Sequence, residues 1–304
     1  MSRRQKLRLA VLQTLAYAEV FSARLEAWQL QRYPISPETF SPDELVQDWQ
    51  EILTQPELKQ VLPHQFSHHH NSDQISQAKW REVQRAVAYL RWIPWIESIW
   101  VTGGLAIGNV QADDDIDFLI VTKPGCLWSS RALVSVVGQL LRKLRRRHHQ
   151  GKQLKDKWCC NVWLESTSLA LKTDQNDLYS ARELVQARPV YNAQSGEARK
   201  FIIANRWVKY YSLQGWLNAD VQSGNLPSRQ FLLWYFPGLK TFITNLGQII
   251  NPILFQAQWQ LMKNHINQEN VSLNSAYFHP LLRSPLIQQE YERIKFALIK
   301  MFYA

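Results

Sequence analysis

One segment, residues 101–122, constrains the fold of this chain more than any other. Its sequence is VTGGLAIGNVQADDDIDFLIVT. An apolar run ends at Gly103 and Gly104, ten residues follow, and Asp115-Ile116-Asp117 opens a second apolar run. Short runs rich in β-branched and aromatic residues, bounded by glycine and aspartate, predict strands. We therefore expect a strand at 96–102, a turn and helix start at the glycine pair, and a second strand at 116–122.

The chemistry of this segment follows from its carboxylates and its glycines. Residues at i and i+2 of a strand project from one face, so Asp115 and Asp117 can reach the same divalent ions. Two-metal phosphoryl-transfer sites hold their ions about 3.5–4 Å apart, and Mg²⁺ prefers oxygen ligands. Gly103 and Gly104 let backbone N–H groups approach a polyphosphate, and a helix starting there adds its positive end. Either half alone is a common turn or solvated loop. Together they predict a corner that binds metal and triphosphate.

The segment resembles the signature of the polymerase-beta-like nucleotidyltransferase superfamily, an apolar residue and Gly-Gly or Gly-Ser followed by a spacer and Asp-x-Asp. The resemblance implies that Asp115 and Asp117 are catalytic and hold two Mg²⁺ ions. It also implies that Gly103 and Gly104 contact the β- and γ-phosphates of an NTP, most simply ATP, and that Asn109 belongs to the nucleotide-binding turn. Many members have Ser where Gly104 stands, so one hydroxyl contact to phosphate is missing here.

More of the chain resembles one subset, the bacterial nucleotidyltransferase-domain proteins with an N-terminal winged-helix-like region. The positions that carry this resemblance are Lys79-Trp80, Pro94, Gly108-Asn109, Trp128, Arg131, 179–184 and 205–207. They span most of the chain. These flanking positions identify relatives and do not specify a reaction.

A third carboxylate is the open question. Active members of the superfamily usually carry an Asp or Glu on a neighbouring strand, as a general base or a third metal ligand. The strand predicted at 158–164 has Asn161 as its central polar residue, and an amide cannot take a proton as a carboxylate does. Glu165 is expected to share the face of Asn161, which makes it the first candidate for the catalytic acid. Asp156, just before the strand, is the second, and a site with no third carboxylate is the remaining alternative.

The whole chain predicts an α+β fold in which a small mixed-sheet nucleotidyltransferase core at 76–198 lies between a winged-helix-like domain at 1–75 and a helical region at 199–304. The core is expected to hold a helix at 76–90, the two strands above, a long helix at 128–147 and the strand at 158–164. The rest is expected to be helical, at 179–186, 200–213, 232–261 and 286–302.

The N-terminal domain is predicted from three helices and a possible wing. Helical spacing covers 6–20 and 25–31, and a third helix begins after Ser41, with Pro42 at its first position and Glu44 completing a capping box. A short hairpin wing is expected at 57–66. Such domains bind DNA or serve as packing and dimerisation modules, and both roles stay open.

The net charge of +10 favours an anionic partner. The basic segment 142–157 is either a nucleic-acid contact or a solvated helix end, and Lys79, Arg131 and this segment are candidate phosphate contacts. The polar stretch with His68, His69 and His70 is expected to be an exposed loop with adventitious metal affinity at most.

Other functional classes have little support. The sequence has no Walker-type Gly-Lys-Ser and no Cys/His pair in a nucleophilic context, and His265 and His279 are isolated. Three cysteines without metal-ligand spacing, Cys126, Cys159 and Cys160, favour a reducing, cytoplasmic setting. No run is long and apolar enough to predict a membrane span, although peripheral membrane association through the aromatic helices after Phe231 stays open.

Two functions follow from the sequence. The first is a Mg²⁺-dependent nucleotidyltransferase that moves a nucleoside monophosphate from an NTP to a hydroxyl of an acceptor, which is a small molecule, an RNA or a protein. The second is a non-catalytic nucleotide-binding or regulatory protein that engages DNA or a partner through its N-terminal domain. Asn161 in place of an acid favours the second.

Overall fold

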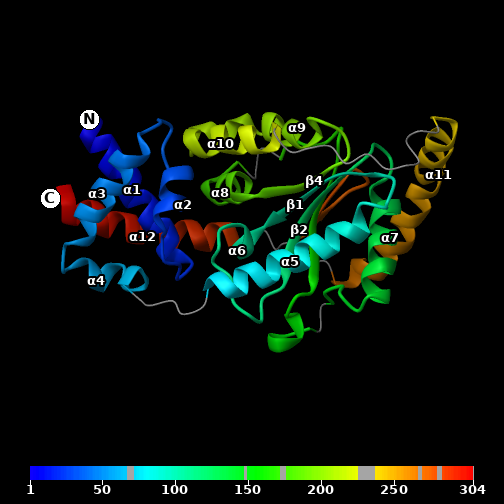
Figure 1. Ribbon diagram of the computed structural model, residues 1–304, viewed down its shortest axis with the longest axis horizontal. Helices are drawn as coiled ribbons and strands as arrows, with labels where there is room; N and C mark the ends of the chain where they lie inside the picture. The colour runs from blue at the N-terminus through cyan, green and yellow to red at the C-terminus, as the bar shows by residue number, and fades with distance from the viewer. Residues whose placement is uncertain are drawn as a thin grey trace.

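The computed structural model (Figure 1) describes residues 1–66, 72–146, 149–171, 176–224, 237–265, 269–278 and 283–303. Several residues discussed above lie outside the described residues: His68, His69, His70, Arg147, 231–236 and His279.

A six-stranded mixed sheet forms the centre of the molecule, in the order β4-β1-β2-β3-β6-β5. β2 and β3 are parallel, and the other neighbouring pairs are antiparallel. The strands are β1 (Ile96–Thr102), β2 (Ile116–Thr122), β3 (Trp158–Glu165), β4 (Arg188–Asn192), β5 (Asn270–Val271) and β6 (Ser275–Tyr277). The sheet and the surrounding helices confirm the α+β class, and β1 and β2 have the predicted bounds.

Three strands contradict the prediction that the chain after β3 is helical. β4 pairs with the outer edge of β1, where Pro189 and the strand-favouring Val190 and Tyr191 fit an extended backbone. β5 and β6 are two and three residues long, and they add to β3 from the far end of the chain. Such short strands are stabilised by their sheet neighbours and leave no periodic pattern in the sequence.

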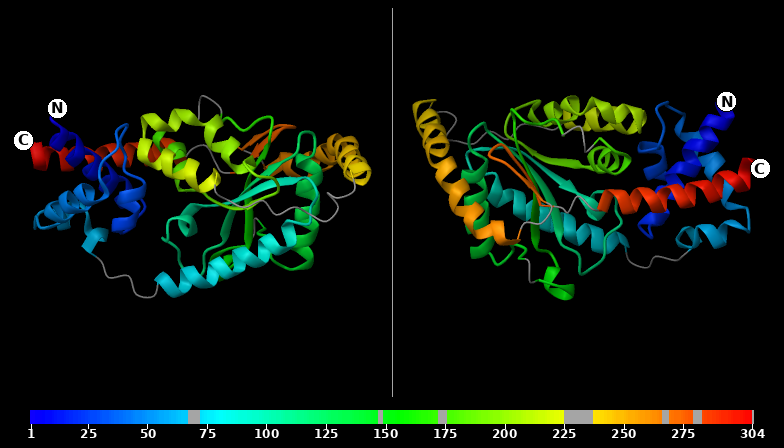
Figure 2. Two further views of the ribbon diagram at one scale, coloured as in Figure 1. Left: turned by 45° about the horizontal axis from the view of Figure 1, so that its top comes forward. Right: turned by 180° about the vertical axis from the view of Figure 1, so that it is seen from behind.

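Helices cover both faces of the sheet (Figure 2). One face packs against α5 (Ser72–Leu90), α7 (Leu127–Leu140) and α11 (Pro237–Met262), and the other against α8 (Leu178–Gln186), α9 (Glu197–Ala204) and α10 (Leu213–Gly224). Alternate residues of β2 serve the two cores: Phe118 and Ile120 face α5 and α7, whereas Leu119 and Val121 face α8 and α9.

The two ends of the chain form one helical head (Figure 1). Its elements are α1 (Arg3–Val20), α2 (Ala27–Arg32), α3 (Pro42–Leu53), α4 (Leu58–Val61), a 3-10 turn at Pro63–Phe66, and α12 (Arg283–Tyr303). Tyr291, Ile294 and Leu298 of α12 are buried in the same core as Leu12 and Leu15 of α1. The head is therefore built from both termini.

The first three helices lie where they were predicted, and Glu44 accepts a hydrogen bond from the backbone of Ser41, as a capping box requires. The predicted hairpin wing at 57–66 is wrong, because this segment folds as α4 and a 3-10 turn. Leu58 and Leu62 are both fully buried at a spacing of four residues, which is a helical pattern. Among residues 1–66 there is no hairpin.

Two predicted helices end early for local reasons. α7 ends at Leu140, and Arg142 then adopts a φ of 55°, which redirects the chain into a bridge with Trp158. The helix predicted at 200–213 breaks at Asn205, whose buried amide donates to the carbonyls of Leu169 and Phe201. Side-chain bonds of this kind compete with helix continuation.

α11 has one apolar face that the rest of the described chain leaves exposed. Its large apolar side chains with more than two-fifths of their surface exposed are Leu239, Phe242, Leu246, Ile249, Ile253 and Leu261. The opposite face packs on the core, where Trp95 donates to the carbonyl of Ile243. No helix in the described ranges has the length and apolarity to cross a membrane.

Candidate metal centre

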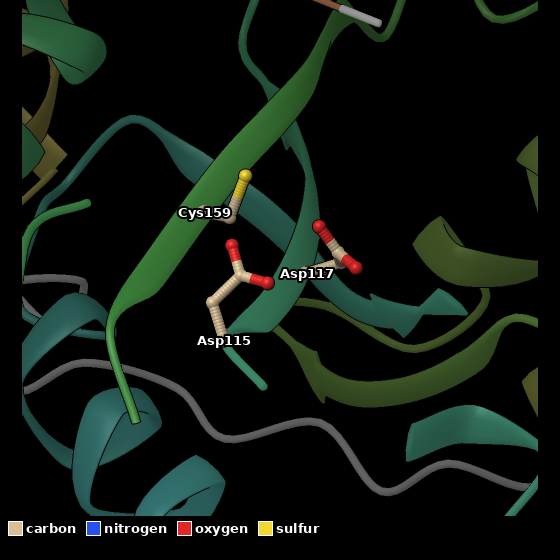
Figure 3. Close-up of side chains that lie close together, drawn as sticks. All are labelled: Asp115, Asp117 and Cys159. Atoms are coloured by element: carbon tan, nitrogen blue, oxygen red, sulfur yellow. The ribbon is translucent and has the colours of Figure 1, made fainter. Parts of the chain in front are cut away.

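Asp115 and Asp117 come together with Cys159 at the start of β2 (Figure 3). One ligand atom from each residue lies within 4.8 Å of the others. The two carboxylates project from one strand face, and Asp117 pairs in register with Cys159 on the neighbouring parallel strand β3. The geometry therefore gathers two oxygen ligands and one sulfur ligand on the face of the sheet that carries α8.

One carboxylate oxygen of Asp117 is held by a hydrogen bond, and the other faces the glycine turn. Asn161 Nδ2 donates to Oδ1 over 2.7 Å. Oδ2 faces Gly103, where an added Cβ would lie only 2.6 Å from it. Burial, the nearby charge of Asp115 and that of Glu183 raise the pKa of Asp117 to about 7. A carboxyl group in this environment is stabilised as the anion by a bound cation.

Asp115 is paired with a cationic side chain. Arg145 Nη1 lies 2.6 Å from Asp115 Oδ2, and it also lies 3.3 Å from Cys159 Sγ. The Asp115 side chain is 14% exposed and that of Arg145 is 39% exposed. The donors of the site therefore already attract a positive group, which approaches from the solvent side.

The turn before the site brings its backbone close to the carboxylates. Gly103 has a φ of 68°, a region that disfavours side chains, and it begins the four-residue helix α6 (Gly103–Ala106). At Gly104 an added Cβ would lie 2.3 Å from the carbonyl oxygen of Asn109. The N–H of Asn109 in turn donates to the carbonyl of Gly104 over 2.9 Å. Both glycines are thus required by close approach, and Asn109 closes the turn through its backbone.

A bulge in β3 determines which of its residues reach the site. The pairing with β2 skips Asn161, since Phe118 lies opposite Cys160 and Leu119 lies opposite Val162. Cys159 and Asn161 both contact the site, whereas Cys160 joins the core on the other face. Beyond the bulge the alternation of side chains is shifted by one residue.

The expectation that Glu165 shares the face of Asn161 is wrong, and the bulge is the reason. Glu165 pairs with Thr122 at the opposite end of β2, six residues beyond Cys159, which is about 20 Å along a strand. Its carboxylate accepts backbone N–H groups at the start of α7, those of Gly125, Leu127 and Cys126, while burial raises its pKa. The structure does not bring Glu165 to the carboxylate pair.

The second candidate acid, Asp156, lies beside Lys79. Lys79 is fully buried, and its Nζ donates to Asp156 Oδ1 over 3.2 Å and to the carbonyl of Asp114 over 2.7 Å. Asp156 and Lys79 therefore hold the loop that leads into β2. Lys79 was predicted as a phosphate contact, and its ammonium group instead binds this loop.

Arg131 is also a packing residue. It donates to Gln258 and lies over the rings of Trp128 and Phe278, at 5.5 and 4.7 Å from their centroids. Burial lowers its pKa to about 10. These contacts hold α7 against α11 and leave its predicted phosphate contact without support.

The described part of the basic segment 142–157 contacts the centre through one side chain. Lys143 pairs with Glu82 over 2.9 Å, Lys157 donates to the carbonyl of Arg142, and Arg145 contacts the centre itself. A cavity of about 290 Å³ is lined by Gly138, Gln139, Arg142, Leu144, Arg146, His149 and Lys157. Of these basic side chains, Arg145 is the one that contacts the carboxylates, and the cavity is lined partly by α7, which packs on the other face of the sheet.

Sequence reasoning missed two residues of the site. Cys159 was treated only as a reduced thiol, although parallel pairing of the strands after Asp117 and Trp158 would have placed it opposite Asp117. Glu183 on α8 is close enough to raise the pKa of Asp117. It lies within the segment 179–184 that carried part of the resemblance. The signal for Glu183 is the helix packing of α8, which the sequence alone does not give.

Comparison of the chain with family models, with curated proteins and with solved structures finds no match. The geometry of this centre is therefore the basis for assigning a function.

Proposed function

We propose that this protein is a nucleotidyltransferase that uses a divalent cation, Mg²⁺ in the superfamily that its sequence resembles, to move a nucleoside monophosphate from an NTP to an acceptor hydroxyl. One observation carries the proposal. Asp115, just before β2, and Asp117, its second residue, bring their carboxylates together, and Gly103 has no side chain to fill the space against Asp117 Oδ2. The donor set fits a divalent cation, because carboxylate oxygens are the ligands such ions take.

Each residue of the centre has a separate proposed role in the transfer. When bound, the cation would neutralise charge that develops on the phosphate oxygens. Asp115 and Asp117 would hold it, and Asn161 keeps Asp117 in one orientation through Oδ1. Gly103 and Gly104 admit the triphosphate close to the backbone. The acceptor hydroxyl oxygen would attack the α-phosphorus and release its proton to solvent, and pyrophosphate would leave with the electrons of the broken P–O bond.

Charge around the centre supports a triphosphate as one substrate. Arg145 lies next to both Asp115 and Cys159, so one guanidinium is already held at the centre. Once a cation takes its place on Asp115, the guanidinium of Arg145 is near enough to pair with phosphate oxygens, which it binds in a fork geometry. ATP is the NTP we propose first.

The test is transfer of label from α-labelled ATP in the presence of divalent cation. Asp115→Asn and Asp117→Asn should each lower transfer by about 1,000-fold, because a cation site contributes several kcal/mol of charge stabilisation. Asp113→Asn, at an exposed position of the same loop, is the matched control and should transfer like the wild type. Undiminished transfer by Asp115→Asn would refute the assignment.

A second candidate is a nucleotide-binding regulator without transfer activity. Asn161 and Cys159 occupy the positions on β3 that face Asp117, and neither is a carboxylate. The helical head would then engage a partner or DNA. Calorimetric binding of ATP, with no labelled product from any acceptor class, would favour this candidate over the enzyme.

A further inference from the structure

The third ligand at the carboxylate pair is a thiol. Cys159 lies directly opposite Asp117 in the parallel pairing of β2 and β3, and its sulfur is within 4.8 Å of a carboxylate oxygen from each aspartate. A pair of Mg²⁺ ions takes oxygen ligands and retains water. The donor set that this chain presents, two oxygens and one sulfur, differs from that requirement.

The spacing of these donors suits a single small ion. Zinc binds oxygen at about 2.0–2.2 Å and sulfur at about 2.3 Å, so tetrahedral donors lie about 3.5 Å apart. The donor atoms of this group lie within 4.8 Å of one another, so they need to approach by little more than about 1 Å to reach that spacing. Asn161 holds Asp117 Oδ1, which leaves Oδ2 for an ion, as outer partners of metal ligands commonly do.

Arg145 shows that the same donors hold a positive group. Its Nη1 lies 2.6 Å from Asp115 Oδ2 and 3.3 Å from Cys159 Sγ, between an oxygen and the sulfur. The side chain is 39% exposed, so it can rotate toward solvent when an ion arrives. The centre is thus reachable, and a cation at this point meets both ligand types.

We propose that Asp115, Asp117 and Cys159 form a mixed carboxylate–thiolate centre that binds Zn²⁺ in preference to Mg²⁺. Thiolate ligands select zinc over magnesium, and three protein ligands with one open position are typical of catalytic zinc. The thiol proton is released to solvent when the ion binds. The inference rests on the same site as the proposed function, and it names the cation that the proposed reaction uses.

The first experiment uses Co²⁺ as a spectroscopic probe on the full chain and Zn²⁺ in competition with a chromophoric chelator. The wild type should show sulfur-to-cobalt charge-transfer absorption, and it should retain Zn²⁺ in a large excess of Mg²⁺. Cys159→Ser should lose the absorption and bind Zn²⁺ about 100-fold more weakly, since even outer partners of metal ligands contribute about 10–100-fold. Cys160→Ser is the matched control, because its side chain lies in the core on the other face of β3.

A second variant is expected to shift the metal preference from Zn²⁺ toward Mg²⁺. Cys159→Asp replaces sulfur by a third carboxylate, so it should abolish the charge-transfer absorption and raise Mg²⁺ affinity relative to the wild type. Circular dichroism and thermal unfolding establish that each variant is folded. Wild-type protein without the sulfur-to-cobalt absorption, or one whose Zn²⁺ is displaced by excess Mg²⁺, overturns the inference.

These metal measurements are independent of catalysis. If Zn²⁺ binds with a thiolate ligand but no metal ion supports transfer from ATP, the zinc centre is supported and the proposed enzyme is refuted. Transfer that requires Mg²⁺, with Cys159→Ser fully active, would support the proposed enzyme and refute the zinc centre.

Discussion

Arg145 Nη1 lies 2.6 Å from Asp115 Oδ2, so a guanidinium stands where a cation would bind Asp115. Any ion that binds the centre must displace this contact. Arg145→Gln should therefore bind divalent cations about 2- to 5-fold more tightly, because partly exposed ion pairs contribute up to about 1 kcal/mol. The same variant should bind ATP more weakly in the presence of the ion. Titration calorimetry with metal alone and then with ATP measures both effects.

Arg146→Gln is the control for the titration with metal alone, since its side chain is exposed and it is Arg145 that contacts Asp115. Equal metal affinity in Arg145→Gln and the wild type would show that the ion pair does not compete with the ion.

Gly103 provides a comparison that separates backbone strain from damage to the site. Gly103 and Gly196 have φ values of 68° and 83°, so alanine at either position should cost about 1–2 kcal/mol of stability. Only at Gly103 would the new Cβ meet the site, at 2.6 Å from Asp117 Oδ2, whereas nothing lies within 4 Å at Gly196. Urea unfolding should give similar losses for both variants. Metal binding should be lost in Gly103→Ala alone, and its retention there would contradict the placement of Asp117.

Glu165 should behave as a structural residue. Its carboxylate accepts the backbone N–H groups that begin α7, so Glu165→Ala should destabilise the fold by about 2 kcal/mol through unsatisfied donors. Metal affinity should not change, because Asp117 pairs with β3 six residues away from Glu165. Thermal unfolding and metal titration test the two statements together. A fully stable Glu165→Ala with lost transfer would instead support the catalytic role expected from the sequence.

The local parts of the fold could be predicted because their causes are local. The bounds of β1 and β2 follow from apolar runs and the residues that end them, and the start of α3 follows from Ser41 and Glu44. The closeness of Asp115 and Asp117 follows from strand alternation alone. These features need no knowledge of distant residues.

The features that could not be predicted depend on pairing between segments that are far apart in the sequence. The parallel register of β3 on β2 places Cys159 opposite Asp117. The bulge at Asn161 turns Glu165 to the face opposite to the one predicted. Neither the register nor the bulge can be recognised in the sequence. A bulge changes the face to which a side chain points and requires no particular residue type. β4 likewise forms because the edge of β1 is open to it.

Glu97 on β1 yields a prediction about pH and stability. Its pKa is raised, chiefly by burial, although Ser166 forms a hydrogen bond with the carboxylate. Its Oε2 atom is buried without a hydrogen-bond partner among the described residues. The folded state therefore binds the proton more tightly than the unfolded chain, whose glutamate titrates near about 4.3. Stability from this group is present below that value and is lost as pH rises toward the raised folded pKa.

Glu97→Gln removes the charge that burial disfavours, while its side-chain oxygen can still accept from Ser166. The variant should be more stable than the wild type at pH 7, and the difference should shrink as the pH is lowered to about 3, where Glu97 is protonated in both states. Urea unfolding at the two pH values measures the difference in the free energy of unfolding. Glu57→Gln, at an exposed position, should follow the wild type at both. A Glu97→Gln protein that is less stable than the wild type at pH 7 would show that the charged carboxylate stabilises the fold.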